Sequence, residues 1–184
     1  MFADLARRLG ESSVEVFAGE RPGERGGGSG VIVSEDGWIA TNAHVVRSRA
    51  PVVRLADGRQ FRGQLVNADK QRDLAIVRIE VGSLVPVTLG DSSSIHPGEV
   101  VVAIGNPFGV ACALSAGVIH SAADQWWIHA DINLAPGNSG GLLANARGQV
   151  IGINAMIWAG LALAVPSNAV RAFLARSARQ RAAA

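Results

Sequence analysis

The sequence has few of the residues that cross-link small proteins or hold chains in membranes. Its 184 residues include one cysteine, Cys112, which excludes an internal disulfide and a cysteine-based zinc site. The longest apolar run, residues 155–166, is too short to span a bilayer as a helix. Asp4, Arg7 and Arg8 stand where a signal peptide needs an apolar segment, so we expect no export signal within this chain.

Charge is also scarce. Charged residues make up 17% of the chain against 48% hydrophobic residues, a balance that excludes a disordered chain and predicts a packed core. The net charge is only +2, and residues 171–184 carry four arginines without an acid. A basic tail of this kind can bind nucleic acid or anionic lipid. No RNA-binding or zinc-finger motif accompanies it, so we expect a solvated helix end, no nucleic-acid partner and no membrane span.

Helical periodicity is confined to the two ends of the chain. Apolar residues recur at helical spacing over residues 2–9 and again over 167–180, where we expect Ser167 to be the N-cap. Between these segments the pattern changes to short runs rich in Val, Ile and Leu. The dipeptides Asp36-Gly37 and Asp57-Gly58 each lie between two such runs, which indicates hairpin turns.

A stretch rich in Ser, Pro and Gly near residues 82–97 separates two groups of about six strands. No segment within either group resembles the crossover helix that parallel strands require, so the strands are expected to pair antiparallel. We predict a single all-β domain built from two six-stranded antiparallel β-barrels with short terminal helices. The N-terminal barrel would span about residues 11–85, the C-terminal barrel 98–166 and the last helix 167–180.

The sharpest local signal is the pentapeptide Gly137-Asn138-Ser139-Gly140-Gly141. Flanking glycines allow a tight turn that exposes the serine hydroxyl and directs the N–H groups of Gly137 and Ser139 toward one oxyanion. The pentapeptide also matches the nucleophile elbow of α/β-hydrolases, in which the catalytic histidine follows the serine. Here all four histidines precede Ser139, namely His44, His96, His120 and His129. Their position excludes the α/β-hydrolase alternative and favours a catalytic triad in the chain order His, Asp, Ser.

His44 is the best candidate for the general base, because it follows the strand-like residues 38–40 and can project from the strand end. Asp73 is the best candidate for its partner, because it directly precedes an apolar strand where a half-buried carboxylate needs a hydrogen-bond donor. His129 and Asp131 alternate on one strand and suggest a metal pair, but two ligands without a third do not define a site. We therefore expect no metal and no cofactor.

Five motifs in chain order resemble the HtrA (Deg) family of serine proteases. They are Thr41-Asn42-Ala43-His44-Val45-Val46, Asp73-Leu74-Ala75-Ile76-Val77, Ala103-Ile104-Gly105-Asn106-Pro107-Phe108-Gly109, Gly137-Asn138-Ser139-Gly140-Gly141 and Val150-Ile151-Gly152-Ile153-Asn154. The resemblance implies a trypsin-like double β-barrel and ATP-independent cleavage of unfolded or misfolded proteins by His44, Asp73 and Ser139. It also implies an extracytoplasmic location and a homotrimer formed through the N-terminal helix and Phe2; a complete chain without a leader would instead be cytoplasmic.

The resemblance also implies a substrate pocket without charge. Its expected lining residues are Asn133, Leu134, Ala155, Met156, Ile157, Ala162, Leu163 and Ala164. An uncharged pocket predicts small or medium aliphatic residues such as Val, Ala or Leu before the cleaved bond. The exposed edge at residues 155–157 is expected to pair with the substrate as an added strand.

Departures from the family pattern support an alternative function. No PDZ domain follows the last helix, Ala135 replaces a common Asn, and Ala155 replaces a common hydroxyl residue that supports the aspartate. These features favour a protease-fold binding or chaperone module whose triad is rarely or never aligned. A nucleotide site at Gly26-Gly27-Gly28-Ser29-Gly30 is excluded, because the run lacks the Gly-Lys-Ser/Thr ending and leads into a strand; we expect it to be a flexible approach to Val31.

Overall fold

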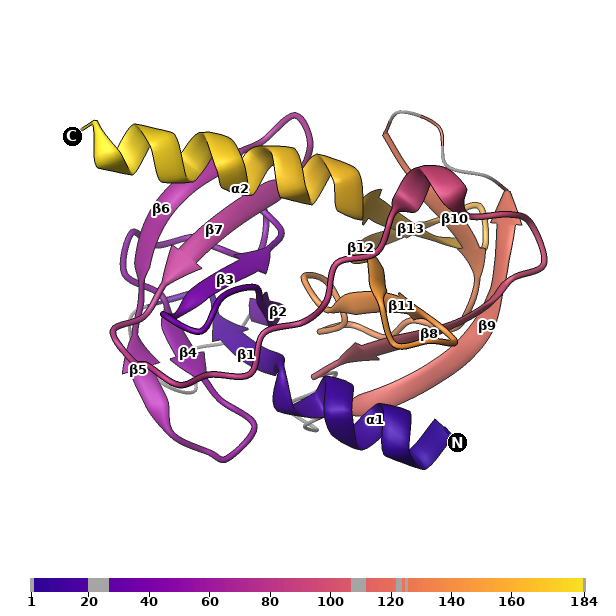
Figure 1. Ribbon diagram of the computed structural model, residues 1–184, viewed down its shortest axis with the longest axis horizontal. Helices are drawn as coiled ribbons and strands as arrows, with labels where there is room; N and C mark the ends of the chain where they lie inside the picture. The colour runs from indigo at the N-terminus through magenta and orange to yellow at the C-terminus, as the bar shows by residue number, and fades with distance from the viewer. Residues whose placement is uncertain (1, 20–26, 107–111, 122–123, 125, 184) are drawn as a thin grey trace.

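The structure, a computed structural model, describes residues 2–19, 27–106, 112–121, 124 and 126–183. It consists of two β-sheet lobes with a helix at each end of the chain (Figure 1). The N-terminal lobe contains β1 (Ser13–Phe17), β2 (Gly27–Ile32), β3 (Trp38–Thr41), β4 (Val52–Arg54), β5 (Gln60–Arg62), β6 (Gln64–Asp69) and β7 (Leu74–Arg78). The C-terminal lobe contains β8 (Val100–Gly105), β9 (Ala113–Ser121), β10 (Ile128–Asp131), β11 (Leu142–Asn145), β12 (Val150–Trp158) and β13 (Leu161–Pro166). The helices are α1 (Phe2–Glu11) and α2 (Ser167–Ala182), and a 3-10 turn, η1 (Ser92–Ser94), lies in the segment that joins β7 to β8.

The C-terminal lobe is a closed six-stranded barrel with the order β10-β13-β12-β11-β8-β9. Every strand pair in it is antiparallel, as the absence of crossover helices predicted. The barrel carries both the loop with Ser139, before β11, and the long hairpin of β12 and β13. The all-β, double-barrel fold predicted from the sequence is confirmed in this lobe without change.

The N-terminal lobe has seven strands where six were predicted, in the order β5-β4-β1-β2-β3-β7-β6. The extra strand arises because β5 and β6, at opposite edges of the sheet, are separated by Gly63 alone. Gly63 is buried, and its N–H donates to the Pro51 carbonyl at 2.7 Å. A Cβ there would lie 2.6 Å from Val77 Cγ1, so the absence of a side chain permits the bend that curls the sheet on itself.

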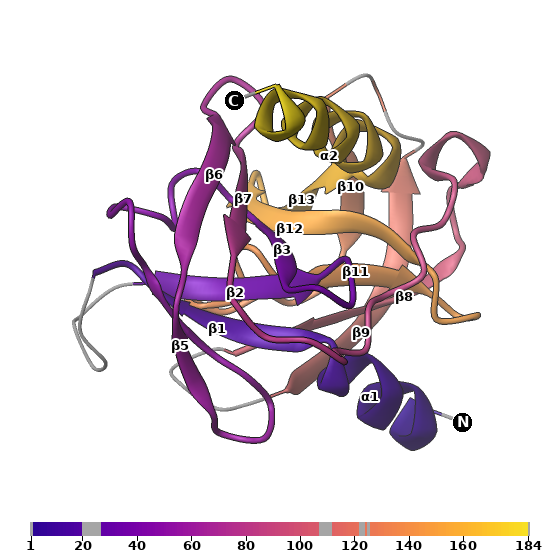
Figure 2. The same ribbon diagram turned by 60° about the vertical axis from the view of Figure 1, so that its left-hand side comes forward.

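The terminal helices cover opposite sides of the strands (Figure 2). Leu5 and Leu9 of α1 and Val170 and Phe173 of α2 are buried in one apolar cluster that also takes residues from both lobes. Each such side chain contributes about 1.5–3 kcal/mol when fully removed from water. The two helices therefore help to fix one lobe against the other. No helix in the described part of the chain is long and apolar enough to cross a membrane.

The expected N-cap of α2 is wrong. Pro166 occupies the cap position, with extended φ and ψ, and no side chain caps the helix. Ser167 is already inside the first turn, buried, and its hydroxyl donates to the Gly90 carbonyl at 2.8 Å. A tertiary contact to the segment between the lobes therefore takes the hydroxyl that the sequence pattern assigned to capping.

Candidate active site

His44 and Asp73 lie in hydrogen-bond contact. β3 ends at Thr41, and His44 follows in a turn; Asp73 immediately precedes β7, which pairs with β3. His44 Nδ1 is 2.7 Å from Asp73 Oδ2, and the His44 backbone N–H donates to Asp73 Oδ1 at 3.0 Å. Both carboxylate oxygens thus bind one residue, an arrangement that fixes the orientation of the imidazole ring.

The two side chains differ in their access to water. The Asp73 side chain is 14% exposed, whereas that of His44 is 49% exposed. Asp73 is one of four non-glycine residues with positive φ among those described, at 52°, and the Asn42 amide donates to its carbonyl at 2.9 Å. The backbone is therefore held in an uncommon conformation that turns a shielded carboxylate toward a solvent-facing imidazole.

The loop with Ser139 has the backbone geometry expected of a nucleophile turn. Gly137 and Gly140 have φ values of 102° and 85°, which residues with a Cβ rarely adopt. The turn is closed by a hydrogen bond from Gly141 N–H to the Asn138 carbonyl at 2.9 Å. The N–H groups of Gly137 and Ser139 donate to no described residue, which leaves both available to an oxyanion.

The Ser139 hydroxyl is hydrogen-bonded to a backbone carbonyl and not to His44. Its Oγ donates to the Ala155 carbonyl of β12 at 2.9 Å, and no hydrogen bond joins it to the imidazole in the described ranges. The structure thus pairs two of the three predicted catalytic side chains, while the third, Ser139 in the turn before β11, is hydrogen-bonded to β12. A rotation about the Ser139 side-chain torsion is needed before the hydroxyl can meet the base.

Ser29 on β2 connects the two halves of the site, and the motif analysis did not identify it. Its N–H donates to the Ser139 carbonyl at 2.7 Å, and its hydroxyl donates to the Gly137 carbonyl at 2.7 Å. The same hydroxyl accepts from the Asn106 N–H at 2.8 Å, and the Ser29 carbonyl accepts from the buried Thr41 hydroxyl at 2.7 Å. Because Thr41 ends the strand that leads to His44, Ser29 positions the nucleophile loop beside the histidine turn.

The glycine run before Val31 is not the flexible approach that we expected. Gly27–Ile32 form β2, in the middle of the N-terminal sheet. A Cβ on Gly28 would lie 2.5 Å from the Ser139 carbonyl and 2.9 Å from a Val45 methyl group. Glycine is thus required at position 28, where the loop with Ser139 and the turn with His44 approach the same strand. The glycine run is visible in the sequence, but the close approach that requires it is visible only in the structure.

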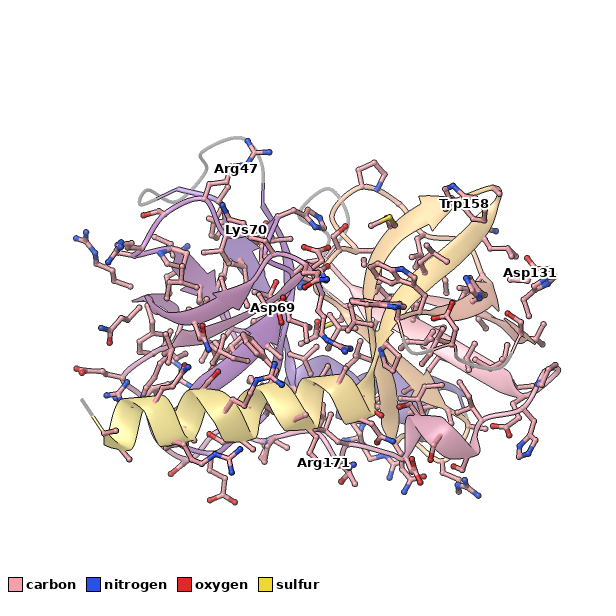
Figure 3. All side chains as sticks on the ribbon, turned by 90° about the horizontal axis from the view of Figure 1, so that it is seen from above. Arg47, Asp69, Lys70, Asp131, Trp158 and Arg171 are labelled. Atoms are coloured by element: carbon pink, nitrogen blue, oxygen red, sulfur yellow. The ribbon has the colours of Figure 1, made fainter. Side chains whose placement is uncertain are left out.

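The residues predicted to bind substrate fall into two groups. Ala155, Ala162, Leu163 and Ala164 are buried in the barrel wall, and Leu134 is half-buried against the same core. Asn133 is exposed, and Met156 and Ile157 are 42% and 56% exposed on the outer half of β12. Trp158 at the end of β12 is 65% exposed and points from the end of the β12–β13 hairpin in Figure 3. The hairpin beside Ser139 is thus an apolar, accessible strand.

The suspected metal pair is explained by hydrogen bonding. His129 Nδ1 lies 2.9 Å from the Ser121 hydroxyl on the adjacent strand, while Asp131 is exposed at the end of β10. Within the described residues, no three His, Cys, Asp or Glu side chains gather as metal ligands would. Cys112 is half-buried, and burial raises the pKa of its thiol, which keeps it in the protonated form.

The double β-barrel fold, together with His44, Asp73 and Ser139, defines the class of protein. The family model of the trypsin-like peptidase domain matches residues 28–153, which include His44, Asp73 and Ser139. The chain belongs to this family of serine-type endopeptidases.

Within that class the similar proteins are HtrA-type serine proteases, which confirms the resemblance found in the motifs. The sequence is 41% identical over 164 residues to serine protease HTRA1 of Xenopus tropicalis, covering 82% of this chain and 36% of that protein. It is 42% identical over 154 residues to a probable periplasmic serine endoprotease DegP-like of Halomonas elongata, covering 76% and 32%. It is also 38% identical over 182 residues to the mitochondrial serine protease HTRA2 of Drosophila erecta, covering 91% and 43%.

A solved structure supports the same assignment. The HtrA-type protease AlgW with decapeptide superposes with a TM-score of 0.86 at 29% identity, over 97% of this chain and 68% of that one. The chain spans less than half the length of the three relatives named above. The similarity therefore concerns their protease domain.

Proposed function

We propose that the protein hydrolyses peptide bonds of unfolded polypeptides, without ATP, through His44, Asp73 and Ser139. The observation that carries this proposal is the doubly hydrogen-bonded His44–Asp73 pair beside a serine turn with two available N–H groups. The pair supplies an oriented base, and the turn supplies a nucleophile and an oxyanion site. The Ser139 hydroxyl, which donates to the Ala155 carbonyl, must release this hydrogen bond before it can meet the base.

In the proposed reaction, Ser139 Oγ attacks the substrate carbonyl carbon while His44 Nε2 takes the hydroxyl proton. The Gly137 and Ser139 N–H groups stabilise the oxyanion, each by about 3–4 kcal/mol in sites of this kind. The C–N bond then breaks, and His44 returns the proton to the leaving amine. Water next attacks the acyl-enzyme with His44 again as the base, which releases the acid and restores the serine.

The exposed strand edge supports an extended, unfolded substrate. β12 continues from Ala155, which accepts the Ser139 hydrogen bond, into the exposed residues Met156 and Ile157. A substrate strand laid along this edge would place its carbonyl at the serine and its apolar side chains on the hairpin. We infer aliphatic residues before the cleaved bond, because the predicted lining residues carry no charge. Cuts mainly after Lys or Arg in a denatured protein would contradict this specificity.

The direct test is labelling by a fluorophosphonate probe, which requires both an activated hydroxyl and a formed oxyanion site. We expect labelling and casein cleavage by the wild type, and loss of both in Ser139→Ala. Ser94→Ala, which removes an exposed hydroxyl of η1 remote from the loop, is the matched control. Equal product formation by wild type and Ser139→Ala would contradict the proposed function.

One observation favours a second function. The hydroxyl bound to Ala155 is not poised for attack, which is the geometry of a protease-fold module that holds unfolded chains without cutting them. The apolar hairpin would then serve as a binding edge. Suppression of aggregation by both wild type and Ser139→Ala, with no probe labelling of either, would establish this function in place of proteolysis.

We also propose an extracytoplasmic location and a homotrimer. The Halomonas relative is described as periplasmic, which supports the location. The resemblance of the N-terminal helix to the family's trimer-forming segment supports the assembly. Light scattering that detects only a species of the chain mass, 19.1 kDa, at micromolar concentration would contradict the trimer.

A further inference from the structure

The two segments that hold His44 and Asp73 carry a group of positive charges with no acidic partner among the residues that the structure describes. Arg47 and Arg49 follow His44 in the loop before β4, and Lys70 lies in the turn between β6 and β7, three residues before Asp73. All three side chains are exposed. We call Arg47, Arg49 and Lys70 the basic rim, and we infer that the basic rim selects substrates with acidic residues on the C-terminal side of the cleaved bond. This inference rests on the proposed proteolysis.

Backbone contacts hold the two segments together around the dyad. The His44 N–H donates to Asp73 Oδ1 at 3.0 Å, and the Leu65 N–H of β6 donates to the Arg49 carbonyl at 2.9 Å. Three residues of extended chain span at most about 11 Å. Arg47 and Lys70 are therefore each within that backbone distance of a dyad residue. Figure 3 shows Arg47 and Lys70 on the same side of the molecule as Trp158 of the C-terminal lobe, whereas α2 lies on the opposite side.

The acids of these segments do not neutralise the basic rim. Asp73 is bound to His44, and Asp69 pairs with Arg176 of α2 at 3.7 Å while accepting the N–H groups of the turn that follows it. Among the described side chains, no carboxylate lies within 4.0 Å of the charged groups of the basic rim. The neighbouring Arg72 differs, because its guanidinium stacks over the Trp126 ring at 4.8 Å. Within the described part of the chain, the three cations of the basic rim are thus exposed and have no acidic partner.

The chemistry of the reaction decides which part of the substrate meets these charges. His44 gives its proton to the leaving amine, so the polypeptide C-terminal to the cleaved bond must leave past the imidazole. The loop with Arg47 and Arg49 begins directly after His44, so we assign its cations to the path of the leaving polypeptide. The N-terminal part of the substrate instead pairs with the uncharged edge of β12. Acidic residues on the leaving side would therefore approach cations, while apolar residues on the other side would approach the hairpin.

The test uses two fluorogenic peptides with the same aliphatic residue before the cleaved bond. One carries Asp, and the other Asn, at the second to fourth positions after that bond. We expect wild-type kcat/KM to favour the Asp peptide by about tenfold in 10 mM salt and to lose most of this preference in 1 M salt, because screening shortens the Debye length from about 30 Å to 3 Å. The variant R47Q/R49Q is expected to lower the ratio several-fold, and K70Q to lower it less.

The matched control is R179Q/R181Q, which also removes two positive charges but at the end of α2. It should leave the ratio of kcat/KM for the Asp and Asn peptides as in wild type. Peptide binding to Ser139→Ala, followed by fluorescence anisotropy, measures the same charge preference without hydrolysis. If wild type cleaves neither peptide but Ser139→Ala still binds the Asp peptide more tightly, the result would count against proteolysis and support the basic rim. A ratio near one in wild type at low salt, or one unchanged by R47Q/R49Q, would overturn the inference. Equal preference for Asp placed before the bond would overturn its assignment to the leaving side.

Discussion

In the N-terminal lobe both oxygens of Asp73 already bind His44, whereas in the C-terminal lobe the Ser139 hydroxyl is held by the Ala155 carbonyl. The dyad is built from two segments flanking adjacent strands of one sheet, β3 and β7, so local strand pairing is sufficient to position it. The serine loop, in contrast, receives its hydroxyl acceptor from its own barrel and is braced through its carbonyls by Ser29 of the other lobe. The difference teaches that the proposed base is positioned by one sheet, while the proposed nucleophile depends on the junction between the lobes.

The largest effect should come from breaking the dyad. Asp73→Asn keeps the shape but forces the wrong imidazole tautomer, and we expect kcat to fall by about 10⁴-fold, as in other sites of this type. Steady-state hydrolysis of the fluorogenic peptide with Asn after the cleaved bond measures the change in kcat. Asp69→Asn, in the same turn but paired with Arg176 on the surface, should stay within about twofold of wild type because exposed ion pairs contribute little. Equal losses of kcat in Asp73→Asn and Asp69→Asn would contradict a specific role for the His44–Asp73 hydrogen bond.

The junction can be broken at Gly140, which has a φ of 85°. A Cβ there would overlap the Ser29 carbonyl and the Thr41 hydroxyl of the other lobe. We expect Gly140→Ala to lower the free energy of unfolding by about 2–5 kcal/mol, from backbone strain together with overpacking. Gly160→Ala is the matched control, because its φ is 82° but no atom lies within 4 Å of the added Cβ. Urea denaturation compares the two variants, and similar losses would show that strain alone, rather than the junction, decides the cost.

A smaller change at the same junction is Ser29→Ala. It leaves the buried Asn106 N–H without its acceptor and frees the Gly137 carbonyl, so we expect a loss of about 1–3 kcal/mol in unfolding free energy together with a lower kcat. Ser34→Ala, whose hydroxyl donates to the exposed Asp36 side chain and accepts only a long hydrogen bond from the Trp38 N–H at 3.4 Å, should cost less than about 0.5 kcal/mol. Loss of stability with unchanged kcat would mean that Ser29 supports the fold but not the nucleophile.

The smallest effect concerns the segment that joins the lobes. The Ser93 hydroxyl, followed by the Asn168 amide of α2, donates to Asp91 and lowers the pKa of its carboxyl to about 2. Because the folded pKa lies below the ordinary value of 3.8, this stabilisation is fully present above pH 4 and is lost as the pH falls toward 2. Asp91→Asn should therefore flatten the acid limb of a plot of unfolding midpoint against pH. Asn168→Ala, which removes one donor, should give an intermediate curve; a wild-type slope in both variants would contradict the assignment.

Much of the site could be predicted because its requirements are local. A serine turn needs glycines at particular positions, and a histidine at a strand end and an aspartate before an apolar strand each have a recognisable neighbourhood. The chain order of these motifs then excluded the α/β-hydrolase alternative. The N-cap at Ser167 could not be predicted correctly, because its hydroxyl bonds to Gly90, which lies 77 residues away in the chain. The bend at Gly63, which separates β5 from the seventh strand of the lobe, β6, likewise depends on packing against Val77.

The sequence by itself determined the class of protein, the chain order of the proposed catalytic residues and the antiparallel β architecture, since these follow from residue chemistry and periodicity along the chain. Only the tertiary structure decided that Ser29 joins the nucleophile loop to the histidine strand, that the glycine run is a site of close approach, and that the Ser139 hydroxyl binds Ala155. Ser29 and Gly137 are 108 residues apart, and a contact over such a separation leaves no periodic trace in the sequence. The same holds for the basic rim, whose cations come from two segments that meet only when β3 and β7 pair.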